Sequence, residues 1–355
     1  MGLKAEILSL NEERNRAFDT TGAYYDRIRH AGKHPTQILV FKCMDGRINL
    51  PLITGVPMGI LKPFRNIGGI FTMGDPYLGR LVLDAVERVA REGHSSLALC
   101  TFHFSKEHND HRGCAGHKYN IAASREGAFT LKHEFDEIFG MHNSAISAIV
   151  VGVETDEDAL ILCGNNGEEL SIADCINFSD AELTHRLRTL YPEVPEEILR
   201  DLLPLVLNNR EHVARIKKEG RPVLELVHNE NIIGVGRGFD WLHLPNRALI
   251  IGPYGHTGGT WREAVEVAGR IVLNNFKSNP ALKAGGALLL ISAPYVDTAE
   301  RGVAIAKAKY FAIVAKQALE PFADELSLDT LVGITDITKM KYHPLTQVSH
   351  YETAS

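Results

Sequence analysis

The chain has 355 residues, of which 45% are hydrophobic and 23% are charged, an ordinary globular balance at a length that suits two domains or one duplicated fold. Its net charge of -6 predicts no basic face, so we expect no nucleic-acid partner. No apolar run reaches the length of a membrane span, and the first residues are not those of a signal peptide, so we expect no membrane association. The five cysteines are an odd number and indicate reduced cytoplasmic thiols rather than a disulfide framework.

Strands and helices alternate in the first half of the chain. Residues 1–30 carry a patchy apolar face and predict helices, which Gly32 and Pro35 end. A helix is predicted over about 76–93, with Asp75 before its first turn, and another over about 117–139. Three apolar runs between these helices predict buried parallel strands, at residues 38–41, 97–102 and 146–153. This alternation predicts a mostly parallel sheet flanked by helices.

The second half repeats the alternation. Strands are predicted at residues 223–227, 248–251, 286–291 and 331–335, and helices at residues 261–276 and about 298–319. The run 95–103 is similar to 285–293, and 149–154 is similar to 330–335. These similarities indicate an internal repeat, although two unrelated α/β domains are the alternative.

We therefore predict an α/β fold, a duplicated sheet flanked by helices, preceded by a helical segment. The predicted parts are an N-terminal helical segment (residues 1–35) and a domain that carries the candidate site (residues 36–178). A helical connector (residues 179–220) and a degenerate repeat of that domain (residues 221–355) follow. No cysteine follows Cys175. A metal held by cysteines in the first copy therefore has no equivalent ligands in the second copy.

Three side chains with metal-binding atoms follow the predicted strands. Cys43 comes after the strand 38–41, His103 comes after the strand 97–102, and Cys114 lies on the loop beyond His103. The carboxyl ends of adjacent parallel strands meet at one edge of a sheet. Taken singly, a buried cysteine or a structural histidine is the commoner interpretation. Together, two thiolates and one imidazole suit zinc and leave a fourth position for water.

These residues lie within recognisable motifs. The Cys-x-Asp-x-Arg pattern of residues 43–47, the Arg-Asn-x-Gly pattern of residues 65–68 and the pair His103 and Cys114 resemble the signature of the β-class carbonic anhydrases. The ordinary β-class has a His-x-x-Cys pattern, which His111 satisfies. The longer separation between His103 and Cys114 resembles the carboxysomal shell carbonic anhydrases, a diverged branch of the class.

The resemblance covers roughly residues 36–340 and implies a duplicated fold of the β-carbonic-anhydrase type with zinc in the first copy only. The implied activity is the reversible hydration of CO2 to bicarbonate. The implied zinc ligands are Cys43, His103 and Cys114. His103 is preferred over His111 because it follows a predicted central strand, which fixes its backbone, whereas His111 lies on a polar loop.

Asp45 and Arg47 are the predicted catalytic residues. The Asp45 carboxylate can accept a hydrogen bond from a zinc-bound hydroxide and orient it. Arg47 can hold this carboxylate away from the metal through a bidentate ion pair. A histidine could carry the product proton away, since its unperturbed pKa is near 6.5; the candidates are His108, His111 and His117.

Two rival functions stay open at this point. One is a carbonyl sulfide or carbon disulfide hydrolase on the same site, and the other is a non-catalytic, zinc-stabilised protein of the carboxysome shell. We expect a homodimer or a larger homo-oligomer, in the cytoplasm, either free or within a carboxysome. The family also has a long N-terminal extension that this sequence does not match, so we expect no strong binding of shell components by residues 1–35.

Overall fold

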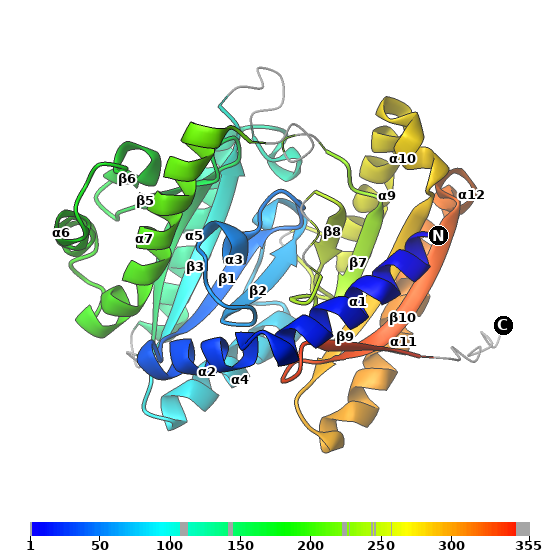
Figure 1. Ribbon diagram of the computed structural model, residues 1–355, viewed down its shortest axis with the longest axis horizontal. Helices are drawn as coiled ribbons and strands as arrows, with labels where there is room; N and C mark the ends of the chain where they lie inside the picture. Colours follow the sequence, from blue (N-terminus) through cyan, green and yellow to red (C-terminus); the bar gives the residue numbers. More distant parts are fainter. Residues whose placement is uncertain are drawn as a thin grey trace. The chain divides into compact units, whose positions relative to one another are not determined.

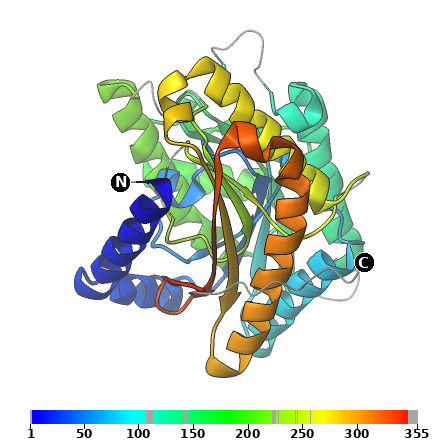
Figure 2. The same ribbon diagram turned by 90° about the vertical axis from the view of Figure 1, so that its right-hand side faces the viewer.

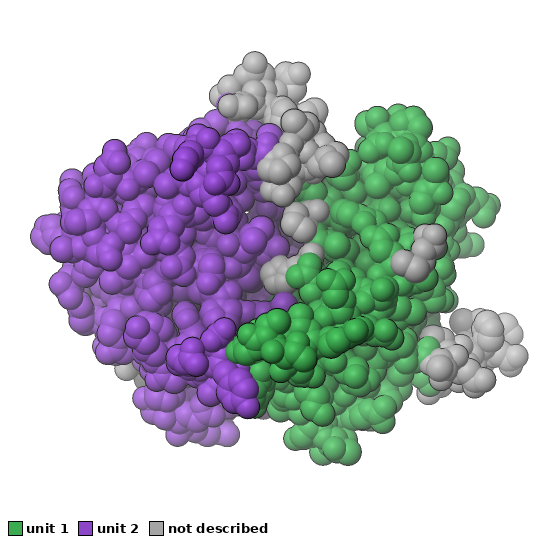
Figure 3. Space-filling model, viewed as in Figure 1, with its two compact units in different colours: residues 1–24, 229–253, 262–355 green, residues 25–228, 254–261 purple. Residues whose placement is uncertain are grey.

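The computed structural model describes residues 2–106, 113–140, 145–221, 226, 228–242, 244, 246–256 and 258–345. The chain forms two compact units, each with one β-sheet. Unit 1 comprises Met1–Tyr24, Asn229–Pro253 and Arg262–Ser355, and unit 2 comprises Tyr25–His228 and Tyr254–Trp261 (Figure 3). Both units are therefore discontinuous in sequence.

Unit 2 contains a six-stranded sheet of order β2-β1-β3-β4-β5-β6 (Figure 1). Its strands are β1 (Gln37–Cys43), β2 (Leu61–Asn66), β3 (Ser96–Phe104), β4 (Ile146–Glu154), β5 (Ala159–Cys163) and β6 (Glu169–Ser171). The first four in this order pair in parallel, and the last two pair antiparallel. Both faces of β1, β3 and β4 are almost wholly buried, as their continuous apolar runs predict. The mostly parallel sheet is thus confirmed.

Along the chain, the helices of unit 2 precede, separate and follow these strands. They are α2 (Ala23–Lys33), α3 (Leu50–Ile53), α4 (Pro76–Arg91), α5 (Ile121–Phe139), α6 (Asp180–Leu190) and α7 (Glu196–Glu219), with 3-10 turns η1 (Ile67–Gly69), η2 (Ala115–His117) and η3 (Ile172–Asp174). The carboxylate of Asp75 accepts hydrogen bonds from the first amides of α4, as predicted. The core under β1 is aromatic, with Phe41 stacked on Phe64 at 4.7 Å and packed edge-on against Phe71 and Phe135.

Helix α5 begins later than the sequence predicted. The prediction placed its start near residue 117, but His117 closes the turn η2, and the next two residues, Lys118 and Tyr119, have left-handed backbones with φ of 52° and 61°. Asn120 then caps the first turn through Ala123 N. The left-handed pair prevents the helix from starting earlier.

Unit 1 contains a five-stranded sheet of order β11-β10-β9-β7-β8. Its strands are β7 (Ile232–Gly236), β8 (Ala248–Ile251), β9 (Ala287–Tyr295), β10 (Leu328–Asp336) and β11 (Lys341–Pro344), and its helices are α1 (Leu3–Thr20), α9 (Trp261–Ser278), α10 (Pro280–Ala284), α11 (Thr298–Leu319) and α12 (Ala323–Leu326), with the 3-10 turn η4 (Glu320–Phe322). Helices α1 and α11 cover opposite faces of this sheet (Figure 2). The side-chain amide of Asn11 on α1 exchanges two hydrogen bonds with the backbone of Tyr342 on β11.

Most strands and helices of the second half were predicted. Strand β8 and helix α11 have the predicted bounds. The predicted strand at 223–227 falls, except for residue 226, outside the described residues. The sequence analysis missed β2, β5, β6, β7 and β11. Among the helices of the described residues, none combines the length and apolar character needed to cross a membrane.

The two sheets have the same topology. Strands β2, β1, β3, β4 and β5 correspond in order and direction to β8, β7, β9, β10 and β11, with four parallel strands followed by one antiparallel strand in each case. The chain is therefore a duplicated α/β fold. The exact domain bounds given by the sequence analysis remain a prediction.

Candidate functional site

The three candidate metal ligands meet at the carboxyl ends of β1 and β3. Cys43 is the last residue of β1, His103 is the penultimate residue of β3, and Cys114 directly precedes η2. All three side chains are buried, and their ligand atoms lie within 4.8 Å of one another. The two sulfur atoms are 3.5 Å apart.

This arrangement fits a metal ion. His103 Nε2 is buried and has no hydrogen-bond partner among the residues that the structure describes, which is costly for a polar atom unless it binds something. In a tetrahedral zinc site with Zn–S bonds of about 2.3 Å, two sulfurs lie about 3.8 Å apart, close to the spacing here. Two thiols and one imidazole are donors of the kind that zinc prefers, and three ligands leave one position open.

The two thiols are electrostatically unequal. The hydrogen bond with Cys114 lowers the pKa of Cys43 well below its usual value, and His103 lowers this pKa further. The same bond raises the pKa of Cys114 well above its usual value. By contrast, burial raises the pKa of Cys163, on β5, to about 12. The hydrogen bond between the two sulfurs thus favours ionisation of one thiol of the pair, and a thiolate is the form that binds metals.

Asp45 and Arg47 form a close pair beside these ligands. Arg47 Nη2 lies 2.8 Å from Asp45 Oδ2, Arg47 Nε lies 3.2 Å from Asp45 Oδ1, and the backbone amide of Arg47 donates to the same Oδ1 at 2.8 Å. Burial alone would raise the pKa of Asp45, but Arg47 and two nearby histidines hold this pKa well below its usual range. Asp45 Oδ2 is also 3.9 Å from His103 Nδ1. An ionised carboxylate therefore faces the ligand cluster.

Glycines bring the loops of the site together. A Cβ atom on Gly116 would lie 2.5 Å from the Cα atom of Gly68, so the turns η1 and η2 touch through their backbones. A Cβ atom on Gly69, whose φ is +68°, would lie 3.2 Å from Thr101 O and 3.4 Å from Cys43 N. Only glycine allows such close approach. The Arg-Asn-x-Gly stretch of residues 65–68 and the Gly-Cys-Ala-Gly stretch of residues 113–116 are thus adjacent parts of one site.

Of the three histidines predicted as candidates for proton transfer, the structure describes one, His117. His117 Nε2 lies 3.1 Å from Gly68 O, which ties η2 to η1 and gives His117 a structural contact. His108 lies outside the described residues, and so does His111, the alternative zinc ligand. Of the two candidate histidine ligands, His103 and His111, the structure describes His103.

Two residues near the site were missed by the sequence analysis. Lys42, inside β1, is only 5% exposed, and burial lowers its pKa to about 7. The signal was a single lysine within an apolar strand. Tyr254 follows β8 far along the sequence, yet its hydroxyl accepts a hydrogen bond from Arg65 N at 2.8 Å, and its carbonyl accepts one from Asn66 Nδ2 at 3.3 Å. No local pattern predicts that contact.

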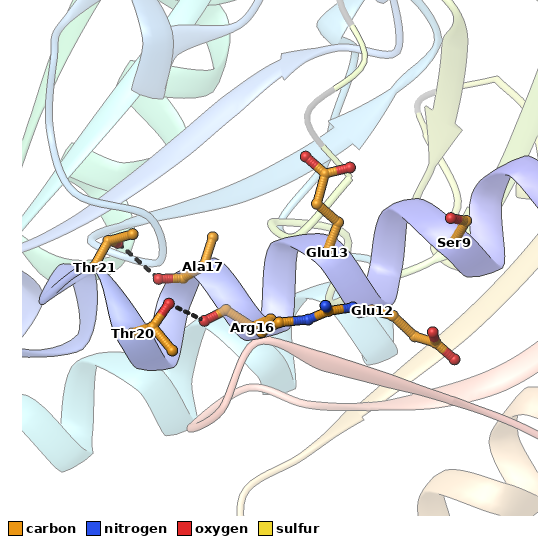
Figure 4. Close-up of a pocket in the computed structure, with 7 residues that line it drawn as sticks. All are labelled: Ser9, Glu12, Glu13, Arg16, Ala17, Thr20 and Thr21. Atoms are coloured by element: carbon orange, nitrogen blue, oxygen red, sulfur yellow. Dashed lines mark hydrogen bonds between the residues drawn. The ribbon is translucent and has the colours of Figure 1, made fainter.

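A hollow on α1 does not form a comparable site. Its lining comes from this single helix, where Thr20 and Thr21 hydroxyls bond to the carbonyls of Arg16 and Ala17 (Figure 4). The residues around it are Ser9, Glu12, Glu13, Arg16, Ala17, Thr20 and Thr21. Within the described part of the chain, no second element contributes a side chain to this hollow, so it carries no argument for a ligand site.

Comparison with known proteins points to one family. The family description "Carboxysome Shell Carbonic Anhydrase, catalytic domain" matches residues 32–176. Proteins named carboxysome shell carbonic anhydrase are 25% identical over 239 residues in Prochlorococcus marinus strain MIT 9313 and 23% identical over 251 residues in Hydrogenovibrio crunogenus. These alignments cover 58% and 61% of this chain.

The same alignments cover 46% and 47% of the two relatives, so the chain spans about half the length of the curated relatives it matches. The matched range contains all three candidate ligands and the Asp45–Arg47 pair. It also contains the whole sheet of unit 2. Residues 32–176 are therefore similar to the catalytic domain of the carboxysome shell carbonic anhydrases.

Proposed function

We propose that the chain is a zinc carbonic anhydrase, which interconverts CO2 and water with bicarbonate and a proton. The observation that carries the proposal is the buried cluster of Cys43, His103 and Cys114 beside the paired Asp45 and Arg47. A structural zinc site takes four protein ligands and has no need of an adjacent ionised carboxylate. Three ligands with an open fourth position are typical of catalytic zinc.

When bound, zinc acts as a Lewis acid that makes water a nucleophile near neutral pH. The chain's own residues then determine its orientation. Asp45 is ionised, so its carboxylate can only accept hydrogen bonds. It accepts one from the O–H group of the nucleophile and thereby orients the attacking oxygen. Such orientation is a large part of catalysis for a small, uncharged substrate such as CO2.

Arg47 keeps Asp45 in this role. The guanidinium and the backbone amide of Arg47 occupy lone pairs on both oxygens of the Asp45 carboxylate. A free carboxylate so close to a zinc ion would compete for the open coordination position. The planar guanidinium fixes the carboxylate by two parallel bonds, which a lysine cannot do.

We assign the histidine ligand to His103. It lies within β3, whose neighbours β1 and β4 fix its backbone, and its Nε2 atom lacks another partner among the described residues. A ligand on a rigid strand keeps its geometry better than one on a loop. His111 is the alternative ligand.

The test is metal analysis of the purified chain combined with stopped-flow CO2 hydration. We expect one zinc per chain and rapid hydration. Zinc without hydration of CO2, but with hydrolysis of carbonyl sulfide or carbon disulfide, would reassign the substrate. Zinc without any turnover would indicate a structural protein, and a chain that binds no zinc would overturn the proposal.

Two further properties follow from the names of the relatives and from the surface of α2. We propose that the chain acts in a carboxysome, which co-sedimentation of the tagged chain with purified carboxysomes would test. We also propose a homodimer or larger homo-oligomer, because Tyr25 and Ile28 on α2 are 66% and 50% exposed and such apolar surface favours burial. Light scattering that finds a monomer at micromolar concentration would contradict the second proposal.

A further inference from the structure

Lys42 is buried where an apolar residue would serve the fold equally well. It lies between Phe41 and Cys43 in the central part of the sheet and is only 5% exposed. Transfer of a charged or strongly polar group from water into the interior is costly unless its hydrogen bonds are replaced. A methionine of similar length would fill the same space without this cost.

The side chain of Lys42 reaches the turn that carries the catalytic pair. Lys42 Nζ lies 2.5 Å from Ile48 O and 3.4 Å from Asp45 O. The same turn is closed by a bond from Ile48 N to Asp45 O at 3.3 Å and by the bond from Arg47 N to Asp45 Oδ1. Lys42 thus bonds to both ends of the turn 45–48 from a rigid strand.

We propose that Lys42 is a positioning residue, which fixes the Asp45–Arg47 pair by holding the carbonyls of Asp45 and Ile48. This inference rests on the proposed function, because it assigns the purpose of the turn. The lysine side chain has N–H donors in both of its protonation states, so the clamp does not depend on which one is present. It acts on the backbone and touches neither substrate nor metal.

The expected effect follows from the short reach of the catalytic contact. A displacement of about 1 Å in an orienting group can cost on the order of 100-fold in rate. We therefore expect Lys42→Met to lower kcat by about 10–100-fold with little change in KM, because only orientation is lost. Zinc content should stay at the wild-type value, since Cys43, His103 and Cys114 are unchanged.

Hydrogen exchange provides a readout that is independent of activity. In Lys42→Met, the backbone amides of Arg47 and Ile48 should exchange faster than in the wild type, with and without zinc. Lys42→Arg keeps N–H donors on a long side chain and should restore part of the protection and part of the rate. If Lys42→Met does not fold, Lys42→Gln takes its place, because its shorter side chain cannot hold both carbonyls.

The matched control is Lys132→Met on α5. Lys132 is 8% exposed and pairs with Asp136 at 2.6 Å, away from the turn, so its loss should change neither the exchange of residues 45–48 nor kcat. Wild-type protection of the turn in Lys42→Met would overturn the inference, and so would equal losses in both variants. A wild-type chain that binds zinc but does not hydrate CO2 would instead refute the proposed function and leave the exchange result readable.

Discussion

The two sheets share a topology but differ at the carboxyl ends of their strands, where the candidate metal ligands of the first copy lie. Gly152 in β4 pairs with Phe102, and Gly333 in β10 pairs with Ser292. The next residues, His103 and Ala293, therefore occupy equivalent places in β3 and β9. The imidazole of the first copy is replaced by a methyl group in the second.

The end of β1 shows the same contrast with β7. Phe41 pairs with Cys100 in the first copy, and Gly234 pairs with Leu290 in the second, which aligns Cys43 with Gly236. A Cβ atom on Gly236 would lie 1.8 Å from Ser292 O, and φ of this residue is +116°. The backbone at this point leaves no room for a side chain. In the same alignment of the two copies, Gly238 corresponds to Asp45, and Asp240 corresponds to Arg47.

The residues that form the sheet therefore differ from those that form the candidate site. Buried strands β3 and β9 are both apolar throughout most of their length, and they form the same sheet with or without ligands at their ends. We therefore predict that the second copy binds no zinc. Substitutions at these strand ends test whether the fold and the candidate site are separable in this way.

Replacing His103 by alanine gives the first copy the residue of the second. His103→Ala should lose zinc and all measurable hydration, because two thiolates alone do not complete the site. His111→Ala should keep zinc and at most slow proton transfer. Metal analysis and stopped-flow assays of both variants are the measurement. If zinc were lost only from His111→Ala, the ligand assignment would be wrong.

Removing either member of the Asp45–Arg47 pair should affect the rate but not metal binding. Asp45→Ala and Arg47→Ala should each lower kcat by about 100-fold or more, since an oriented acceptor typically contributes this much, with zinc content unchanged. Hydration assays on zinc-quantified protein measure both quantities. Loss of zinc from either variant would show that the replaced residue supports the metal site itself.

Filling the closed strand end of the second copy should damage stability. Gly236→Ala should lower the free energy of unfolding by about 3 kcal/mol or more, because the new methyl group would overlap Ser292 O and the backbone is strained for any other residue. Gly302→Ala on α11 is the control, since its surroundings are open, and it should gain up to about 1 kcal/mol. Denaturant unfolding of both variants tests this, and similar stabilities would refute it.

Glu154 gives the smallest effect, one that depends on pH. It is fully buried at the end of β4, where Thr335 stands in the second copy. Burial raises its pKa from 4.5 to about 7, although two backbone amides and Lys106 oppose this shift and Asp156 adds to it. The folded chain therefore binds a proton that the unfolded chain releases, so Glu154 reduces stability progressively as pH rises from about 4.5 to 7.

Glu154→Gln removes this titration. Relative to the variant, the wild type should lose at most about 3 kcal/mol between pH 5 and pH 8. The measurement is denaturant unfolding of both proteins at the two pH values, with the difference between proteins taken at each pH so that other titrating groups cancel. A difference that does not change with pH would show that the Glu154 carboxyl titrates normally.

The sequence predicted the elements whose interactions are local or uniformly apolar. Strands β1, β3 and β4 were identifiable because both faces are buried, which makes their sequences continuously apolar. Strand β2 was missed because Pro63 and two basic residues interrupt it, which an edge strand tolerates. The late start of α5 follows from the left-handed backbones of Lys118 and Tyr119, which the sequence analysis did not predict.

The candidate ligands and the Asp45–Arg47 pair were identifiable because motif spacing and strand ends are written in the sequence. The structure brings the three candidate ligands together. Lys42 stands out in the sequence as a single lysine within an apolar strand, but neither its role nor that of Tyr254 could be predicted, because both depend on hydrogen bonds to backbone atoms. Backbone partners leave no trace in side-chain patterns.

The bond between Asn11 and Tyr342 sets a timing problem for synthesis. These residues are 331 positions apart, so at roughly 5–20 residues per second α1 waits on the order of tens of seconds for its strand to be made. During that time its apolar side chains Leu3, Ile7 and Phe18, all buried in the finished protein, are exposed to water. Such distant pairing slows folding and favours aggregation, so newly made chains should depend on chaperones until β11 has emerged from the ribosome.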